Sequence, residues 1–260
     1  MTRPKLVVNA DDLGLSPEVN DGILMAVTHG IVTAVELLVN PPFSVDLQPF
    51  LQAKISIGLH LNLCLGRPCS DLSSGRKRSS DDLSIVQANG FFCHDLEMVL
   101  ANLEMEEARH EIGQQVERFV SLVGRFPDHL TFHKHLHARD QRLLLLVAEV
   151  GREHGIPVRA LNATMRATLR ENLVQVNDSF LGDVKPSPYW TPARLETALG
   201  EMKPGVTELM CHPGKMMRPI PGVWYLQERE IELETLTSAN ARTLASRFDL
   251  VNFSQAFSRE

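Results

Sequence analysis

The chain has 260 residues, 43% of them hydrophobic and 22% charged, which is enough apolar content for a sizeable core in one or two domains. Its 26 basic and 32 acidic residues give a net charge of −6, which argues against a general nucleic-acid binder. No stretch approaches the roughly 20 apolar residues that cross a membrane, and the four cysteines form no CxxC pair. We therefore expect a cytoplasmic protein with reduced thiols and neither nucleic-acid nor membrane partners.

The first predicted elements are a short strand and a well-marked helix. The apolar run Leu6–Val8 predicts a buried strand. Ser16 is a typical helix N-cap and is followed by Pro17 at the first helical position, and the apolar face of this helix ends at Gly30. Two further strands are expected next, over residues 35–39 and 55–61.

Residues 66–90 have no regular period and contain a serine-rich basic tract, so we expect a flexible loop there. Because the loop follows the 55–61 strand directly, it is a candidate lid over the end of that strand. The elements predicted beyond it are a long helix over 96–123, a strand over 130–132, a helix over 143–153 ending near Gly155, a strand over 158–161, a helix opened by Thr191, a strand over 208–211, a helix from Ser238 to Leu244, and a last strand at 250–251.

Alternation of this kind predicts parallel strands joined by crossover helices. A complete or broken barrel fits better than an open sheet, because no glycine-rich nucleotide-binding turn follows the first strand. The sequence shows neither an internal repeat nor a linker. We therefore expect an α/β protein with mostly parallel strands, folded as one deformed (β/α) barrel domain over residues 1–260.

Ionisable side chains follow four of the predicted strands. Asp11 and Asp12 end the first, His60 lies at the end of the 55–61 strand, and His133 and His212 follow two later strands. The carboxyl ends of barrel strands meet on one face, so these side chains should converge. Taken singly, Asp12 reads as a helix cap and His60 as a core histidine. Two adjacent carboxylates repel each other, however, and a cation is the simplest compensation.

Three histidines also occur at alternate positions, His133, His135 and His137. In an extended segment all three would point to one side, which favours a metal or substrate role. A mixed set of aspartate and histidine donors suits a hydrolytic divalent ion such as Zn²⁺, with one position left open for water. The residues alone do not choose between Zn²⁺ and Mg²⁺.

Four segments resemble the signatures of the YdjC family, which includes chito-oligosaccharide deacetylases. They occur in the family's order: NADDLG over 9–14, GLHLNL over 58–63, HKHLH over 133–137 and ELMCHPG over 208–214. The resemblance implies a deformed (β/α) barrel related to polysaccharide deacetylases, and a metal held by one aspartate and two histidines. It also suggests a homodimer.

Position by position, the resemblance implies that Asp12, His60 and His133 bind one divalent metal ion, Zn²⁺ or Mg²⁺. It further implies Asp11 as the catalytic base and His212 as an acid or an oxyanion stabiliser. The third motif departs from the family, because Thr131 and Phe132 stand where Asp-Ser is common. We therefore expect a changed contact behind the metal ligands.

Together these observations predict a metal-dependent N-deacetylase acting on an acetylated amino sugar or oligosaccharide. His135, His137 and Trp190 are expected to bind the substrate, and other candidates for stacking on a sugar are Phe180, Tyr189 and Trp224. Two alternatives stay open. One is another barrel-type metal hydrolase that cleaves a phosphoester or a cyclic amide, and the other is a catalytically inactive carbohydrate-binding protein.

Overall fold

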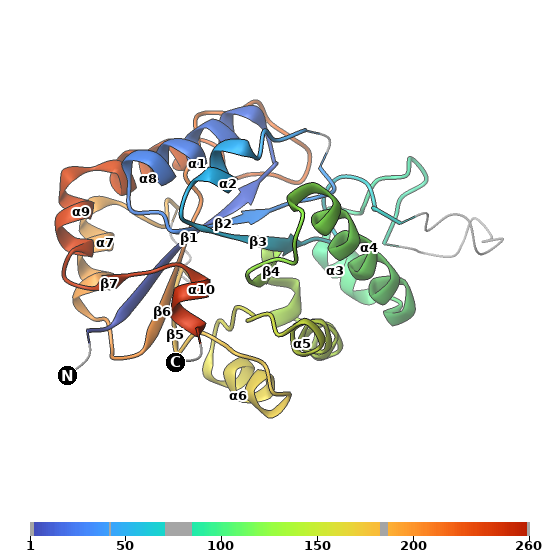
Figure 1. The fold of residues 1–260 in the computed structure, drawn as a ribbon. Helices are drawn as coiled ribbons and strands as arrows, with labels where there is room; N and C mark the ends of the chain where they lie inside the picture. The colour runs from blue at the N-terminus through green and yellow to red at the C-terminus, as the bar shows by residue number, and fades with distance from the viewer. Residues whose placement is uncertain (1–2, 42, 71–84, 183–186, 259–260) are drawn as a thin grey trace.

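A curled parallel sheet forms the centre of the protein, and helices surround it in the computed structural model (Figure 1). The structure describes residues 3–41, 43–70, 85–182 and 187–258. The sheet has the strand order β4-β3-β2-β1-β6-β5, and β7 pairs with β1. The strands are β1 (Lys5–Leu13), β2 (Ala34–Leu37), β3 (Ser56–Leu61), β4 (Leu130–Phe132), β5 (Ser179–Leu181), β6 (Val206–Cys211) and β7 (Asp249–Leu250). The paired strands run parallel, so the expected barrel-like α/β fold is confirmed.

Between β4 and β5 the barrel wall is irregular, and this seam explains the deformation. The N–H of Leu130 donates to the carbonyl of Pro157, and the N–H of Arg159 donates to the carbonyl of Leu130. On the far side, the side-chain amide of Asn177 pairs with both backbone groups of Ala160, at 2.8 and 2.9 Å. The strand predicted over 158–161 is therefore wrong: only one bridge forms there, because a side chain replaces the neighbouring ladder.

Three helices begin at the capping residues that the sequence indicated. Ser16 accepts a hydrogen bond from the Val19 N–H, Thr191 accepts one from the Arg194 N–H, and Ser238 accepts one from the Ala241 N–H. The helices are α1 (Pro17–His29), α2 (Gln48–Gln52), α3 (Leu96–Ala101), α4 (Met105–Val123), α5 (Gln141–His154), α6 (Ala163–Glu171), α7 (Pro192–Gly200), α8 (Glu228–Thr237), α9 (Ala239–Ala245) and α10 (Phe253–Phe257). Among the described residues, none of these helices has the length and apolar character needed to cross a membrane.

The single helix predicted over 96–123 is wrong, because the chain breaks between α3 and α4. Asn102 ends α3, and its side-chain amide donates to the Met98 carbonyl at 2.8 Å. Leu103, in the break, is buried in the core. Competition by the Asn102 amide for a backbone carbonyl, together with burial of Leu103, accounts for the interruption.

Close packing of α1 fixes the turn that follows β6. A Cβ atom on Gly22 would lie 2.3 Å from the Cα of Gly214, so only glycine allows this approach. The Lys215 N–H also donates to the Glu18 carbonyl in the first turn of α1. The turn that carries His212 is thus held against a helix that begins just beyond the end of β1.

Candidate functional site

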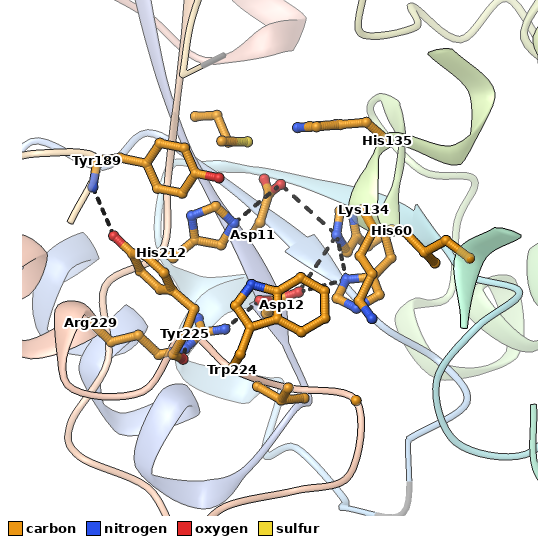
Figure 2. Close-up of a pocket in the computed structure, with 15 residues that line it drawn as sticks. Asp11, Asp12, His60, Lys134, His135, Tyr189, His212, Trp224, Tyr225 and Arg229 are labelled. Atoms are coloured by element: carbon orange, nitrogen blue, oxygen red, sulfur yellow. Dashed lines mark hydrogen bonds and ion pairs between the residues drawn. The ribbon is translucent and has the colours of Figure 1, made fainter. Parts of the chain in front are cut away.

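The end of β1 brings two adjacent carboxylates into one pocket. Neighbouring residues of a regular strand point to opposite faces. Asp12, however, has a φ of 72°, and the pairing of β1 with β2 shifts between Ala10 and Leu13. This irregularity turns Asp12 so that it lines the same cavity as Asp11 (Figure 2). A left-handed conformation at a residue other than glycine costs about 1–3 kcal/mol, and such strain clusters at functional sites.

The cavity has a volume of about 260 Å³ and lies at the carboxyl ends of the strands. Three predicted ligand residues meet in it, and all three are buried: Asp12, His60 and His133. Asp12 Oδ1 lies 3.0 Å from His133 Nδ1 and 3.6 Å from His60 Nε2, and the two nitrogens are 3.3 Å apart.

This triangle of atoms fits a divalent ion. Ligand atoms about 2.0–2.2 Å from a tetrahedral Zn²⁺ lie about 3.4 Å from one another. Asp12 Oδ1 is also a buried oxygen that accepts no hydrogen bond from the described residues. A buried acceptor without a donor is costly, so the arrangement is suited to a cation at this point.

His60 is held as a neutral imidazole, which is the form that binds a metal ion. Thr131 Oγ1 lies 2.6 Å from His60 Nδ1. When Nδ1 carries the proton and donates to Thr131, the lone pair of Nε2 faces Asp12 and His133. Burial, with a contribution from His133, lowers the pKa of His60 to about 3, so the ring is neutral at pH 7. Thr131 is the position at which the third motif departs from the family pattern.

Asp12 is kept ionised by a residue that the sequence analysis missed. Burial alone would raise its pKa, but Arg229 and then His133 outweigh burial, and the pKa lies well below its usual range. Arg229 Nη2 donates to Asp12 Oδ2 at 2.6 Å. The guanidinium therefore occupies one carboxylate oxygen and leaves Oδ1 to the histidines.

Asp11 is held by a second buried arginine. Arg159 Nη1 and Nη2 donate to the two oxygens of Asp11, each at 2.7 Å, and Arg159 Nε donates to Glu208 at 2.8 Å. Asn9 links Glu208 to Glu36, whose carboxylate lies 2.5 Å from His129 Nε2. The floor of the pocket is thus a buried polar network. A charged residue within the apolar run 156–161 was the available sequence signal for Arg159.

His212 lies across the pocket from His60, with its Nε2 4.0 Å from Asp11 Oδ2. Its ring contacts Tyr189 and Tyr225, with centroids 5.3 and 5.4 Å away. Burial lowers the pKa of His212 to about 4, although Asp11 opposes the shift. The backbone N–H of His212 donates to Glu232 Oε2 at 2.7 Å, and the Tyr225 hydroxyl donates to Glu232 Oε1.

Helix α8 supplies both Arg229 and Glu232, and no helix was predicted over its residues. Their spacing of three places both side chains on one helical face. Both are buried, although charged residues rarely are unless they are paired. The spacing was the available signal, but neither residue belongs to the four motifs.

The expectation of three histidines on one face of an extended segment is wrong. Residues His133–Ala138 form a 3₁₀ turn, in which Lys134 and His135 have φ values of 53° and 55°. These left-handed residues break the alternation that an extended segment would have. His133 and His135 line the pocket, whereas His137 is buried behind it, with Nε2 3.3 Å from the Arg159 carbonyl.

The aromatic candidates also separate. Trp190 is buried in the core, and its indole N–H donates to the Met210 carbonyl at 2.6 Å, so it does not line the cavity. Tyr189 and Trp224 do line it (Figure 2). Phe180 contacts His135 edge-on, with ring centroids 6.0 Å apart.

The predicted lid falls largely on residues 71–84, which lie outside the described residues.

Fold and site together define an α/β barrel protein with a candidate divalent-metal centre at the carboxyl ends of its strands. The family described as YdjC-like protein matches residues 5–247. The chain belongs to the YdjC family, as its four motifs indicated.

Relatives with assigned names match most of the chain. A carbohydrate deacetylase of Clostridium beijerinckii is 31% identical and aligns over 96% of this chain and 98% of its own length. A chitooligosaccharide deacetylase of Klebsiella pneumoniae subsp. pneumoniae is also 31% identical, with coverages of 91% and 92%.

Solved structures share the fold. A proposed cellobiose-phosphate cleavage protein from Enterococcus faecalis V583 is 25% identical, has a TM-score of 0.80, and aligns over 98% of this chain and 99% of its own. The Xyl-CE4 domain of a xylanase from the hindgut metagenome of Trinervitermes trinervoides is 12% identical, has a TM-score of 0.53, and aligns over 98% and 90%. The second likeness concerns the fold alone.

Proposed function

We propose that this protein is a metal-dependent N-deacetylase that removes the acetyl group from an acetylated amino sugar or oligosaccharide. The observation that carries the proposal is the buried triangle of Asp12, His60 and His133, with Asp11 and His212 beside it in one pocket. The names of the two deacetylase relatives support the substrate class.

In this proposal Asp12 Oδ1, His60 Nε2 and His133 Nδ1 hold one divalent ion. Two imidazoles with a single carboxylate suit Zn²⁺ better than Mg²⁺, which prefers oxygen ligands. When bound, such an ion acidifies a water molecule and polarises the acetyl carbonyl. Arg229 keeps Asp12 charged, and Thr131 orients His60, so both ligands are prepared before the ion arrives.

Asp11 acts as the general base that accepts a proton from the attacking water. Its Oδ2 lies 3.9 Å from His60 Nε2, so a water beside the triangle is within reach of a hydrogen bond. The two hydrogen bonds from Arg159 fix the plane of the carboxylate. Because the carboxylate is already oriented, less free energy is needed to position the base for the reaction.

His212 donates a proton to the departing amine. Its pKa of about 4 means that the free protein holds this ring neutral at pH 7. The ring must therefore gain its proton during the reaction. Asp11 Oδ2, 4.0 Å from His212 Nε2, is placed to deliver the proton that it took from water. Tyr189 and Tyr225 limit where the ring can move.

His135 is the predicted substrate-binding residue that lines the pocket, and we propose that it contacts the sugar. His137 and Trp190 support the wall from behind. One domain, a homodimer and a cytoplasmic location also belong to this proposal. The four free cysteines are in keeping with a reducing compartment.

An acetate-release screen over N-acetylated mono- and oligosaccharides, with and without chelator, tests the function. We expect acetate from at least one amino sugar, and its loss when the metal is removed. Sugar binding without acetate release from any of them would instead support the inactive carbohydrate-binding protein. Turnover of phosphoesters or cyclic amides alone would support the other class of hydrolase.

A further inference from the structure

Trp224 is an exposed aromatic residue at the pocket, and the proposed mechanism gives this residue no role. Its side chain is 69% exposed and lines the same cavity as Asp12 and His133 (Figure 2). Those two residues are buried, at 3% and 7% exposure, so Trp224 forms the outer part of the cavity. A large apolar surface left open beside a site commonly marks a place where a ligand binds.

The segment that carries Trp224 is fixed on both sides. The Val223 N–H donates to the Ile220 carbonyl, closing a turn in which Gly222 has a φ of 82°. After Trp224, the Tyr225 carbonyl accepts a hydrogen bond from Arg229 Nε at 2.9 Å. The backbone on both sides of Trp224 is therefore held in place before any ligand arrives, which lowers the entropic cost of ordering this segment on binding.

Lys134 lies over one face of the indole. Its Nζ lies 4.3 Å from the centroid of the Trp224 ring, within the range of a cation–π contact. The Lys134 backbone has a φ of 53°, and its ammonium has no hydrogen-bond acceptor among the described residues. Because the ammonium lies over one face of the indole, the exposed surface of Trp224 is the remainder of the ring.

We propose that Trp224 is the platform of an outer subsite that binds the sugar residue next to the acetylated one. Pyranose rings present an apolar C–H face, which an aromatic surface covers while the hydroxyl groups stay in water. The deep end of the cavity holds the triangle and Asp11, so the acetylated residue lies there and the next residue reaches Trp224. The protein therefore prefers a substrate of at least two sugar residues. This inference rests on the proposed function.

Intrinsic fluorescence reports on the platform without requiring turnover. The chain has two tryptophans, and Trp190 is only 3% exposed, so a sugar at the outer subsite changes the emission of Trp224 alone. The metal-loaded Asp11→Asn protein is titrated with N,N′-diacetylchitobiose and with N-acetylglucosamine. We expect a saturable change with the disaccharide, at a concentration about tenfold lower than with the monosaccharide, and its loss after Trp224→Phe. The same saturable change in the Trp224→Phe protein would overturn the platform.

Kinetics on the wild-type background give a second readout. The ratio of kcat/KM for the disaccharide to that for the monosaccharide should fall on the order of tenfold in Trp224→Ala, as expected for a lost stacking contact. Phe126→Ala is the matched control, because Phe126 is 48% exposed and stacks on His154 away from the pocket. An unchanged ratio in Trp224→Ala contradicts the subsite.

These results separate this inference from the proposed function. Acetate release together with a Trp224-independent fluorescence change overturns the platform and leaves the deacetylase intact. A Trp224-dependent change without acetate release supports the platform and overturns the deacetylase.

Discussion

Arg229 Nη2 donates to Asp12 Oδ2 at 2.6 Å, while Oδ1 of the same carboxylate lies 3.0 Å from His133 Nδ1. One oxygen of Asp12 thus accepts a hydrogen bond from a helix outside the barrel, and the other remains open to a cation. On the proposed function, the metal affinity of the triangle therefore depends on α8, which carries Arg229, as well as on the strand ends.

Replacing Arg229 with Met should weaken metal binding by about 10- to 100-fold, the usual effect of losing a partner of a ligand. Without the guanidinium, burial raises the pKa of Asp12, so protons compete better with the metal and the loss should grow as the pH falls. Calorimetric titration with Zn²⁺ at pH 7 and 6 measures this. Arg152→Met, on the exposed surface of α5, is the control, and equal affinities in the two variants would remove Arg229 from the site.

The sequence predicted the strand ends better than the surroundings of the site. Asp11, Asp12 and His60 each follow a short apolar run, and parallel topology alone brings such ends together. Arg229 and Glu232 come from a helix with no strong start signal, since its N-cap Gln227 makes no side-chain capping hydrogen bond. Such long-range partners leave no local pattern along the chain.

Backbone conformation was the other part that the sequence did not reveal. Lys134 and His135 adopt left-handed φ values, which residues of their type rarely take, so extended geometry was the natural expectation after β4. The roles of the two tryptophans also depend on tertiary packing. Trp190 follows a loop and yet is buried, whereas Trp224 is exposed at the pocket.

Asp11→Asn should keep the metal bound and lower kcat by about 10²- to 10⁴-fold, because an amide cannot accept the proton from water. The change also removes one of the two carboxylates paired with buried Arg159 and leaves Glu208 as its partner, so the protein should lose stability, by less than the about 3–5 kcal/mol of a fully broken buried pair. Steady-state kinetics, metal analysis and thermal unfolding check the three effects. Asp21→Asn, whose carboxylate is exposed, should behave as wild type. Wild-type turnover in Asp11→Asn would show that another group is the base.

Glu232→Gln should lower kcat while metal affinity stays unchanged. The carboxylate accepts hydrogen bonds from the backbone N–H of His212 and from the Tyr225 hydroxyl, and an amide can accept with only one of its two polar atoms. The backbone that carries the His212 ring then loses its fixed position relative to Asp11. Glu234→Gln, on the exposed face of α8, is the control. A fall in metal affinity as large as the fall in kcat would mean that Glu232 supports the fold of the site rather than His212.

The metal-free protein should lose stability as the pH falls from about 6.5 towards 4. Burial lowers the pKa of His137 and of His212 to about 4, below the ordinary value of 6.5, so the unfolded chain binds more protons across this window. Each such histidine contributes up to about 1.4 kcal/mol per pH unit. Urea unfolding of metal-free protein at several pH values measures the slope.

His137→Gln isolates one of these histidines, because His137 lies behind the pocket and contacts the Arg159 carbonyl. The slope of the unfolding free energy against pH should fall by up to about 1.4 kcal/mol per pH unit between pH 6.5 and 4, which is the contribution of one proton. A slope identical to that of wild type would show that His137 titrates normally in the folded state.

On the proposed function, one ion in the Asp12–His60–His133 triangle supports deacetylation. The most direct test is acetate release from N,N′-diacetylchitobiose by metal-stripped protein, measured as Zn²⁺ is added in sub-stoichiometric steps. We predict that release rises linearly and levels off at one ion per chain, and that Asp12→Ala abolishes this rise. Full release before any metal is added, or a wild-type titration curve in Asp12→Ala, would contradict it.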